Sequence, residues 1–160
     1  MDLLHTQLLM QSISSMAIAV GLIVAAVQFR HWRKVAYVGN FTKLVEMQME
    51  LRKMRVDDPS LAKVYTHDVA EMANDQEIRE YFMNLMQVSI FEIVWFSHIN
   101  HMIPDDYFES WVKRMRDIAQ EESFQKMVAT KSMKIHHDGF QKYLEELAAE
   151  VRNDGGRRGM

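Results

Sequence analysis

Two histidines and two aspartates gather over a few positions in the middle of this 160-residue sequence. His98 and His101 are three residues apart, so on a helix they share a face, and Asp105 follows shortly after them. Imidazole and carboxylate groups are common ligands of zinc and iron, which makes these three residues the candidate metal ligands. However, the sequence has no Glu-x-x-His motif of the kind that carboxylate-bridged di-iron bundles use. We therefore predict no metal and no cofactor.

The same positions also fit the end of one helix and the start of the next. Pro104 is a suitable start for a helix, and Asp105 and Asp106 could cap its N-terminus and interact with its dipole. His101 would then lie near the C-terminus of the preceding helix, where a partly positive side chain is favourable. A helix junction is therefore the alternative to a metal site.

Glu92 is the polar residue that helix ends do not explain. On a helical wheel it shares the core face with Phe82, Leu85, Ser89, Phe96 and Ile99. A buried carboxylate must find a partner or stay protonated. The candidate partners are Arg52, Arg55, Arg114, Arg116 and the indole N–H groups of Trp95 and Trp111. We favour a structural ion pair or hydrogen bond over catalysis, because no nucleophile or second carboxylate is identifiable beside Glu92. His136 and His137 are interpreted as capping a further helix junction.

The N-terminal segment is long and apolar enough to cross a membrane. Residues 8–29 contain no charged side chain, and about 20 mostly apolar residues span a hydrocarbon core. A cleaved signal peptide would carry positive charge before its apolar core, whereas here Asp2 and His5 precede it. The other alternative is a buried helix of a soluble protein. We predict an anchor over residues 1–34.

Basic and aromatic residues follow the span and predict its orientation. Arg30, Arg33 and Lys34 lie directly after it, so the positive-inside rule places the N-terminus outside and the rest in the cytoplasm. Trp32 would lie at the headgroup level. The same charges could bind anionic lipid headgroups. The predicted location is the inner (plasma) membrane, crossed once.

Small residues form a strip along one face of the span. Ser14, Ala17, Gly21 and Ala25 are three to four positions apart, and such strips allow another helix to approach closely. The alternative is that glycine and alanine are simply common in spans. We expect other membrane-protein subunits, or self-association through the span, in addition to membrane lipid.

Residues 35–152 are predicted to form a compact all-α bundle of about five to six helices. The first apolar stripe contains Phe41, Leu44, Met47, Leu51 and Met54. After the Asp58-Pro59 start signal, a second helix would present Leu61, Val64, Tyr65, Val69 and Met72 on one face. A nearly all-apolar helix from Asn74 to about Ile99 would be central, and three more would follow, the second of them using Phe124, Met127, Val128 and Ile135. Residues 153–160 are expected to be a flexible tail.

Composition excludes some classes of function. The net charge of −3 provides no broadly basic surface for nucleic acid, and the absence of cysteine excludes thiolate metal sites and cysteine nucleophiles. Phosphate-binding glycine loops, Gly-x-Ser-x-Gly elbows and His-Glu-x-x-His motifs are also missing from the sequence. We predict a protein that is not an enzyme.

Several segments resemble a group of uncharacterised bacterial proteins with one N-terminal span and a cytoplasmic helical domain. The resemblance is carried by the Asp58-Pro59 turn, the Phe91-Glu92 pair and the helix that contains Trp111. It covers most of the chain after Val35. It implies a fold and a topology, and no activity, cofactor or catalytic residue.

Three functional hypotheses follow from these observations. The first is a non-enzymatic accessory, structural or assembly subunit of a larger membrane complex, for which a respiratory or photosynthetic complex is one plausible host. The second is a membrane-tethered signalling or regulatory domain. The third is a metal-dependent enzyme that uses His98 and His101.

Overall fold

A computed structural model describes residues 2–130 and 136–158 of the chain. The described residues form five α-helices and two short 3-10 helices, and no β-strand occurs among them. The predicted all-α class is therefore confirmed. Ile135 and the last two residues of the expected tail lie outside the described part.

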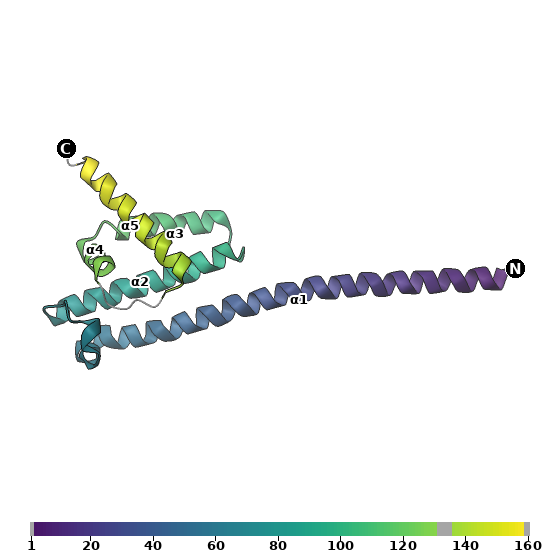
Figure 1. Ribbon diagram of the computed structural model, residues 1–160, viewed down its shortest axis with the longest axis horizontal. Coiled ribbons are helices and arrows are strands. Elements are labelled where there is room, and N and C mark those ends of the chain that lie inside the picture. The colour runs from purple at the N-terminus through teal and green to yellow at the C-terminus, as the bar shows by residue number, and fades with distance from the viewer. Residues whose placement is uncertain (1, 131–135, 159–160) are drawn as a thin grey trace. The chain divides into compact units, whose positions relative to one another are not determined.

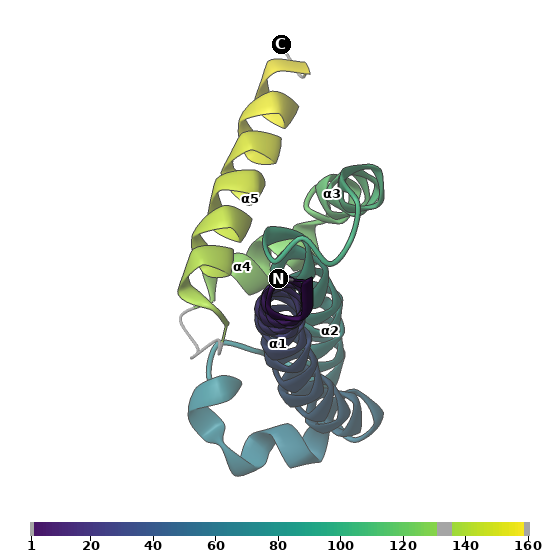
Figure 2. The ribbon, with the colours of Figure 1, turned by 90° about the vertical axis from the view of Figure 1, so that its right-hand side faces the viewer.

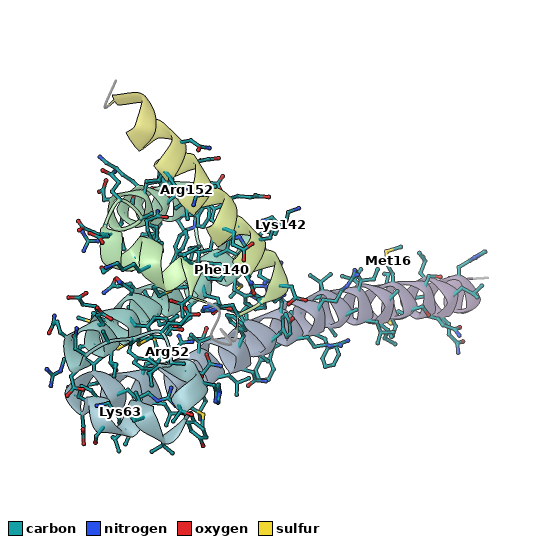
Figure 3. All side chains as sticks on the ribbon, turned by 60° about the vertical axis from the view of Figure 1, so that its left-hand side comes forward. Met16, Arg52, Lys63, Phe140, Lys142 and Arg152 are labelled. Atoms are coloured by element: carbon teal, nitrogen blue, oxygen red, sulfur yellow. The ribbon has the colours of Figure 1, made fainter. Side chains whose placement is uncertain are left out.

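The first helix, α1, runs without a break from Asp2 to Asp57. The chain nevertheless divides into two compact units, residues 1–39 and residues 40–160, so the boundary falls within this helix. In the first unit, none of the most apolar 18-residue window is buried, and its side chains project on all sides, Met16 among them (Figure 3). By length and composition this segment is a candidate membrane span.

Asp58 and Pro59 end α1 and begin the next element. The Asp58 carboxylate accepts hydrogen bonds from the backbone N–H and hydroxyl of Ser60, and Pro59 is the first residue of the 3-10 helix η1, Pro59–Val64. A second 3-10 helix, η2, covers Thr66–Asp68.

The prediction of one amphipathic helix across this region was wrong. Of the predicted inward-facing residues, Leu61, Val64 and Tyr65 are exposed, whereas Val69 is buried and Met72 packs against the core. Pro59 and Ala62 are buried in addition. A 3-10 helix has about three residues per turn, so residues that share a face in an α-helix no longer do so.

Helix α2, Asp75–Ile99, is the centre of the second unit. Asn74 caps it by accepting hydrogen bonds from the backbone N–H groups of Gln76 and Glu77. The C-terminal part of α1 and the two 3-10 helices lie on one side of α2, and α3 to α5 lie on the other (Figures 1 and 2). Because neighbours cover α2 on both sides, it is apolar around most of its circumference.

Three further helices complete the core. They are α3, Asp105–Ile118, α4, Glu122–Ala129, and α5, Asp138–Arg158. Their fully or nearly fully buried side chains are Met115, Phe124, Met127, Phe140, Leu144, Leu147 and Ala148. Phe91 of α2 has its ring centroid 5.7 Å from that of Phe140, so α2 and α5 share an aromatic contact. Helix α5 continues to Arg158, past the predicted end of the bundle at Arg152.

The predicted core stripe of α1 is the largest correction. Leu44, Met47, Leu51 and Met54 are 63%, 57%, 60% and 54% exposed, whereas Val45 and Arg52 are buried. Phe41 does reach the core, where its ring stacks on Phe96 with centroids 3.9 Å apart. The apolar periodicity was real, but α1 contacts α2 through a neighbouring face that contains an arginine. Periodicity shows that a face is apolar, and the packing partner decides which face is covered.

Candidate functional site

The predicted helix-packing strip of the span is accessible. Ser14, Ala17, Gly21 and Ala25 are all exposed, and a Cβ added at Gly21 would meet no atom within 4 Å. Within the described chain, an alanine at Gly21 would therefore clash with nothing. The strip is free to meet a helix of another chain.

The residues predicted to orient the span remain on its surface. Trp32 is 78% exposed, Arg30 and Arg33 are exposed, and Lys34 is partly covered. Solvent-facing basic and indole groups immediately after an apolar segment suit a membrane interface, because they can reach headgroups without leaving a buried contact unsatisfied.

His98 and Asp105 are brought together, but without a metal-binding geometry. The His98 Nε2 atom lies 2.9 Å from Asp105 Oδ1, and the His98 ring stacks on Phe108 with centroids 4.0 Å apart. Among the described residues, no group of three or more His, Asp or Glu side chains is arranged to hold a metal ion. The pair links the end of α2 to the start of α3.

His101 has a backbone role at the end of α2. Its φ of 56° places it in the left-handed region, its N–H donates to His98 O, and Met102 N–H donates to Ser97 O. These two bonds form the Schellman motif that closes many helices, usually with glycine at the His101 position. Pro104 occupies the N-cap of α3 and no side chain caps that helix, so the predicted capping by Asp105 and Asp106 was wrong. Their charges remain in the first turn, where the helix dipole favours them.

Glu92 is buried and its partner is a histidine that was missing from the predicted set. The Glu92 carboxylate is 2% exposed, and its Oε2 atom lies 2.7 Å from Nδ1 of His136, whose side chain is 1% exposed. The other carboxylate oxygen, Oε1, accepts a hydrogen bond of 2.6 Å from the backbone N–H of His137. Both oxygens of Glu92 are thus satisfied by the residues that precede α5.

His137 caps α5 as predicted, whereas His136, which was also predicted to cap, contacts Glu92 instead. Its Nδ1 accepts a hydrogen bond of 3.2 Å from Gly139 N–H, and its carbonyl accepts from Gln141 N–H. An accepting Nδ1 must carry a lone pair, so the ring is neutral with its proton on Nε2. The Glu92 carboxyl group, which accepts from His137 N–H, also lies at the N-terminus of α5, where the helix dipole favours negative charge. Gly139 leaves room for Trp95, whose ring would lie 3.2 Å from a Cβ at that position.

The chemistry available to the Glu92–His136 pair is limited by its burial. A carboxylate that orients an imidazole through Nδ1 is also the arrangement of general-base dyads, in which Nε2 faces the substrate. Here the described residues offer His136 Nε2 no hydrogen-bond partner, and the 1% exposed side chain offers a substrate no access. The arrangement fits a structural connection between α2 and α5.

Arg52 forms a second buried polar contact on α2. Its guanidinium donates to the carbonyl of Leu85 at 3.1 Å and to the hydroxyl of Ser89, which itself donates to Leu85 O at 2.9 Å. Figure 3 shows Arg52 near the C-terminal end of α1. Burial lowers the pKa of Arg52 from its ordinary value, and the negative charge of Glu92 partly opposes that shift. Arg52 was among the candidate partners of Glu92, but its guanidinium bonds to Leu85 and Ser89 instead.

A groove of about 330 Å³ lies beside Arg52, with Leu51, Arg55, Tyr65 and Asp68 in its lining. Arg55 pairs with Asp68 at 3.3 Å and lies over the rings of Tyr65 and Phe82 at 5.8 and 5.0 Å. Its charge is thus already engaged by an acid and two aromatic faces.

Comparisons with known proteins add no assignment. No protein-family model, curated protein sequence or solved structure matches this chain.

Proposed function

We propose that this chain is a non-enzymatic, single-span membrane protein whose helical domain serves as an accessory, structural or assembly subunit of a larger membrane complex. The observation that carries the proposal is the exposure of the apolar N-terminal part of α1. None of its most apolar window is buried, and leaving so much apolar surface in water is unfavourable. A bilayer would cover it.

The polar residues of the domain support an interaction protein over an enzyme. Glu92, His98, His101 and Arg52 each take part in a contact that connects or ends helices. Helix α2 also has the length and composition of a span, but 44% of its most apolar window is buried in the domain. A single span by α1 is therefore the topology that we propose, with the N-terminus outside and the domain in the cytoplasm.

The topology can be tested with single cysteines, because the sequence contains none. Gln7→Cys precedes the span and Lys113→Cys lies on an exposed position of α3. A membrane-impermeant maleimide should label Gln7→Cys in intact cells and Lys113→Cys only after lysis. Equal labelling of both variants before lysis, or release of the protein from membranes by alkaline carbonate, would refute the proposed topology.

The subunit role can be tested by comparing two substitutions of equal kind. Gly21→Leu fills the small-residue strip, whereas Ala19→Leu adds bulk on the opposite face of the same helix. After mild-detergent purification from the native membrane, we expect Gly21→Leu to lose co-purifying subunits that Ala19→Leu retains. Identical partner sets for both variants, or a protein that purifies alone, would contradict the proposal.

A further inference from the structure

The exposed apolar residues of α1 within the second unit follow a heptad pattern. Leu44, Met47, Leu51 and Met54 are separated by three, four and three residues, the spacing of a coiled-coil seam with Leu44 and Leu51 at the first core position of each heptad. All four are more than half exposed. We call these four residues the α1 seam.

The α1 seam is separate from the face that packs on α2. Val45 and Arg52, which are buried, are roughly 130° around the helix from the centre of the seam at 100° per residue. The core of the domain therefore does not use the seam. A contiguous apolar strip of this length on the surface indicates an interaction site.

We propose that the α1 seam binds the α1 seam of a second copy of this chain, with the two helices parallel. In a parallel coiled coil, the residue just before the first core position of a heptad faces the residue five positions later in the partner helix. That rule sets Glu50 against Arg55 of the second copy, and the reciprocal pair forms by symmetry. Lys43 meets the neutral Gln48 in the same way, so no like charges oppose each other. Arg55 keeps its 3.3 Å contact with Asp68, and Glu50 of the second copy adds a second acid to it.

The parallel orientation rests on the proposed membrane topology. Two copies inserted in the same direction have parallel spans, and in each copy the seam follows the span within α1. The seam covers about three helical turns, which is short for an isolated coiled coil in water. Confinement to one membrane raises the effective concentration of the second copy and lowers the entropic cost of pairing.

Disulfide trapping tests the proposal in the full-length chain. Leu51→Cys places two sulfur atoms at the same level of a parallel pair, within the reach of a disulfide, whereas Lys53→Cys is exposed on a different face of α1. Two differently tagged copies are expressed together, and their membranes are oxidised. We expect Leu51→Cys to link the two tagged copies and Lys53→Cys to leave them unlinked. A Leu51→Cys that stays unlinked, links only to a different polypeptide, or links no faster than Lys53→Cys overturns the proposal.

A second variant tests the seam without added cysteine. Leu44→Glu combined with Leu51→Glu should raise the dimer dissociation constant about tenfold or more in mild detergent, measured by light scattering, because four carboxylates would meet at the seam. Lys53→Glu is the matched control and should leave the dimer intact. Both leucines are exposed, so the helical circular dichroism should not change. A monomeric wild-type chain, or a dimer that the double variant leaves intact, would exclude the seam.

Different results would refute the proposed membrane topology and the proposed pairing of the α1 seams. A chain that carbonate releases but that still forms the Leu51→Cys disulfide would refute the membrane topology and leave the pairing in place. A membrane-embedded chain without the disulfide would refute the pairing alone.

Discussion

Glu92 of α2 and His136, just before α5, lie 2.7 Å apart with both side chains almost fully buried. They are 44 positions apart in the sequence, and their contact connects the central helix to the start of the last one. Because Glu92 also accepts a hydrogen bond from His137 N–H, one carboxylate positions the whole N-terminus of α5.

Removing the charge of Glu92 should destabilise the domain. Glu92→Gln is expected to lower the free energy of unfolding by about 3 kcal/mol, since breaking one side of a buried pair leaves the other group uncompensated. Glu145→Gln, an exposed change of the same kind on α5, should stay within about 0.5 kcal/mol. Denaturant titration of the full chain in mild detergent measures both variants. Equal effects would show that the buried contact does not stabilise the fold.

The pairing of Glu92 with His136 can be measured by a double-mutant cycle. His136→Asn alone and together with Glu92→Gln should give non-additive changes, with a coupling of about 1–3 kcal/mol. Additive effects would mean that the two side chains act independently.

Ser89→Ala tests the buried contact of Arg52. The Ser89 hydroxyl accepts a hydrogen bond from the Arg52 guanidinium, and hydrogen bonds to charged groups contribute about 1.5–3 kcal/mol to stability. We expect Ser89→Ala to lower the free energy of unfolding by an amount near the lower end of this range, because Arg52 keeps Leu85 O as a partner. The control is Ser110→Ala, whose exposed hydroxyl donates to Asp106 O one turn earlier on α3. If thermal unfolding of the two variants shifts equally, the Arg52 contact is not a source of stability.

Replacing His101 by glycine should stabilise the protein. A non-glycine residue in the left-handed region is strained by about 1 kcal/mol, and glycine at this position of a Schellman motif removes the strain. His67→Gly, in η2, should instead destabilise slightly, because glycine there only adds freedom to the unfolded chain. A His101→Gly variant with a lower melting temperature than the wild type would contradict the interpretation of His101 as a helix end.

Asp58 should make stability depend on pH in the acid range. Hydrogen bonds from the Ser60 hydroxyl and then the Ser60 N–H lower the pKa of Asp58, so the folded state holds its proton less tightly than the unfolded state. The contribution is complete above the unfolded pKa of about 3.9 and disappears as pH falls through the lower folded value. The melting temperatures of wild type and Asp58→Ala should therefore differ at neutral pH and converge in acid. A constant difference would exclude this capping charge as the cause.

The sequence alone determined the candidate span and the ends of several helices. The charge-free stretch of residues 8–29 predicted the candidate span. Asn74 predicted the start of α2, and the Asp58-Pro59 pair predicted the end of α1, because capping and proline signals act on the few neighbouring residues of the backbone. The wheel also set Glu92 on the core face of α2, where it is 2% exposed.

The tertiary structure decided which groups meet. His136 could not be selected as the partner of Glu92 because their distance depends on how α5 crosses α2, and no local pattern encodes that crossing. In the same way, the stripe from Leu44 to Met54 was recognisable as apolar, but its burial depended on which face of α1 meets α2. Local physical chemistry therefore specifies helices and their apolar faces, whereas contacts between distant residues follow only from the assembled packing.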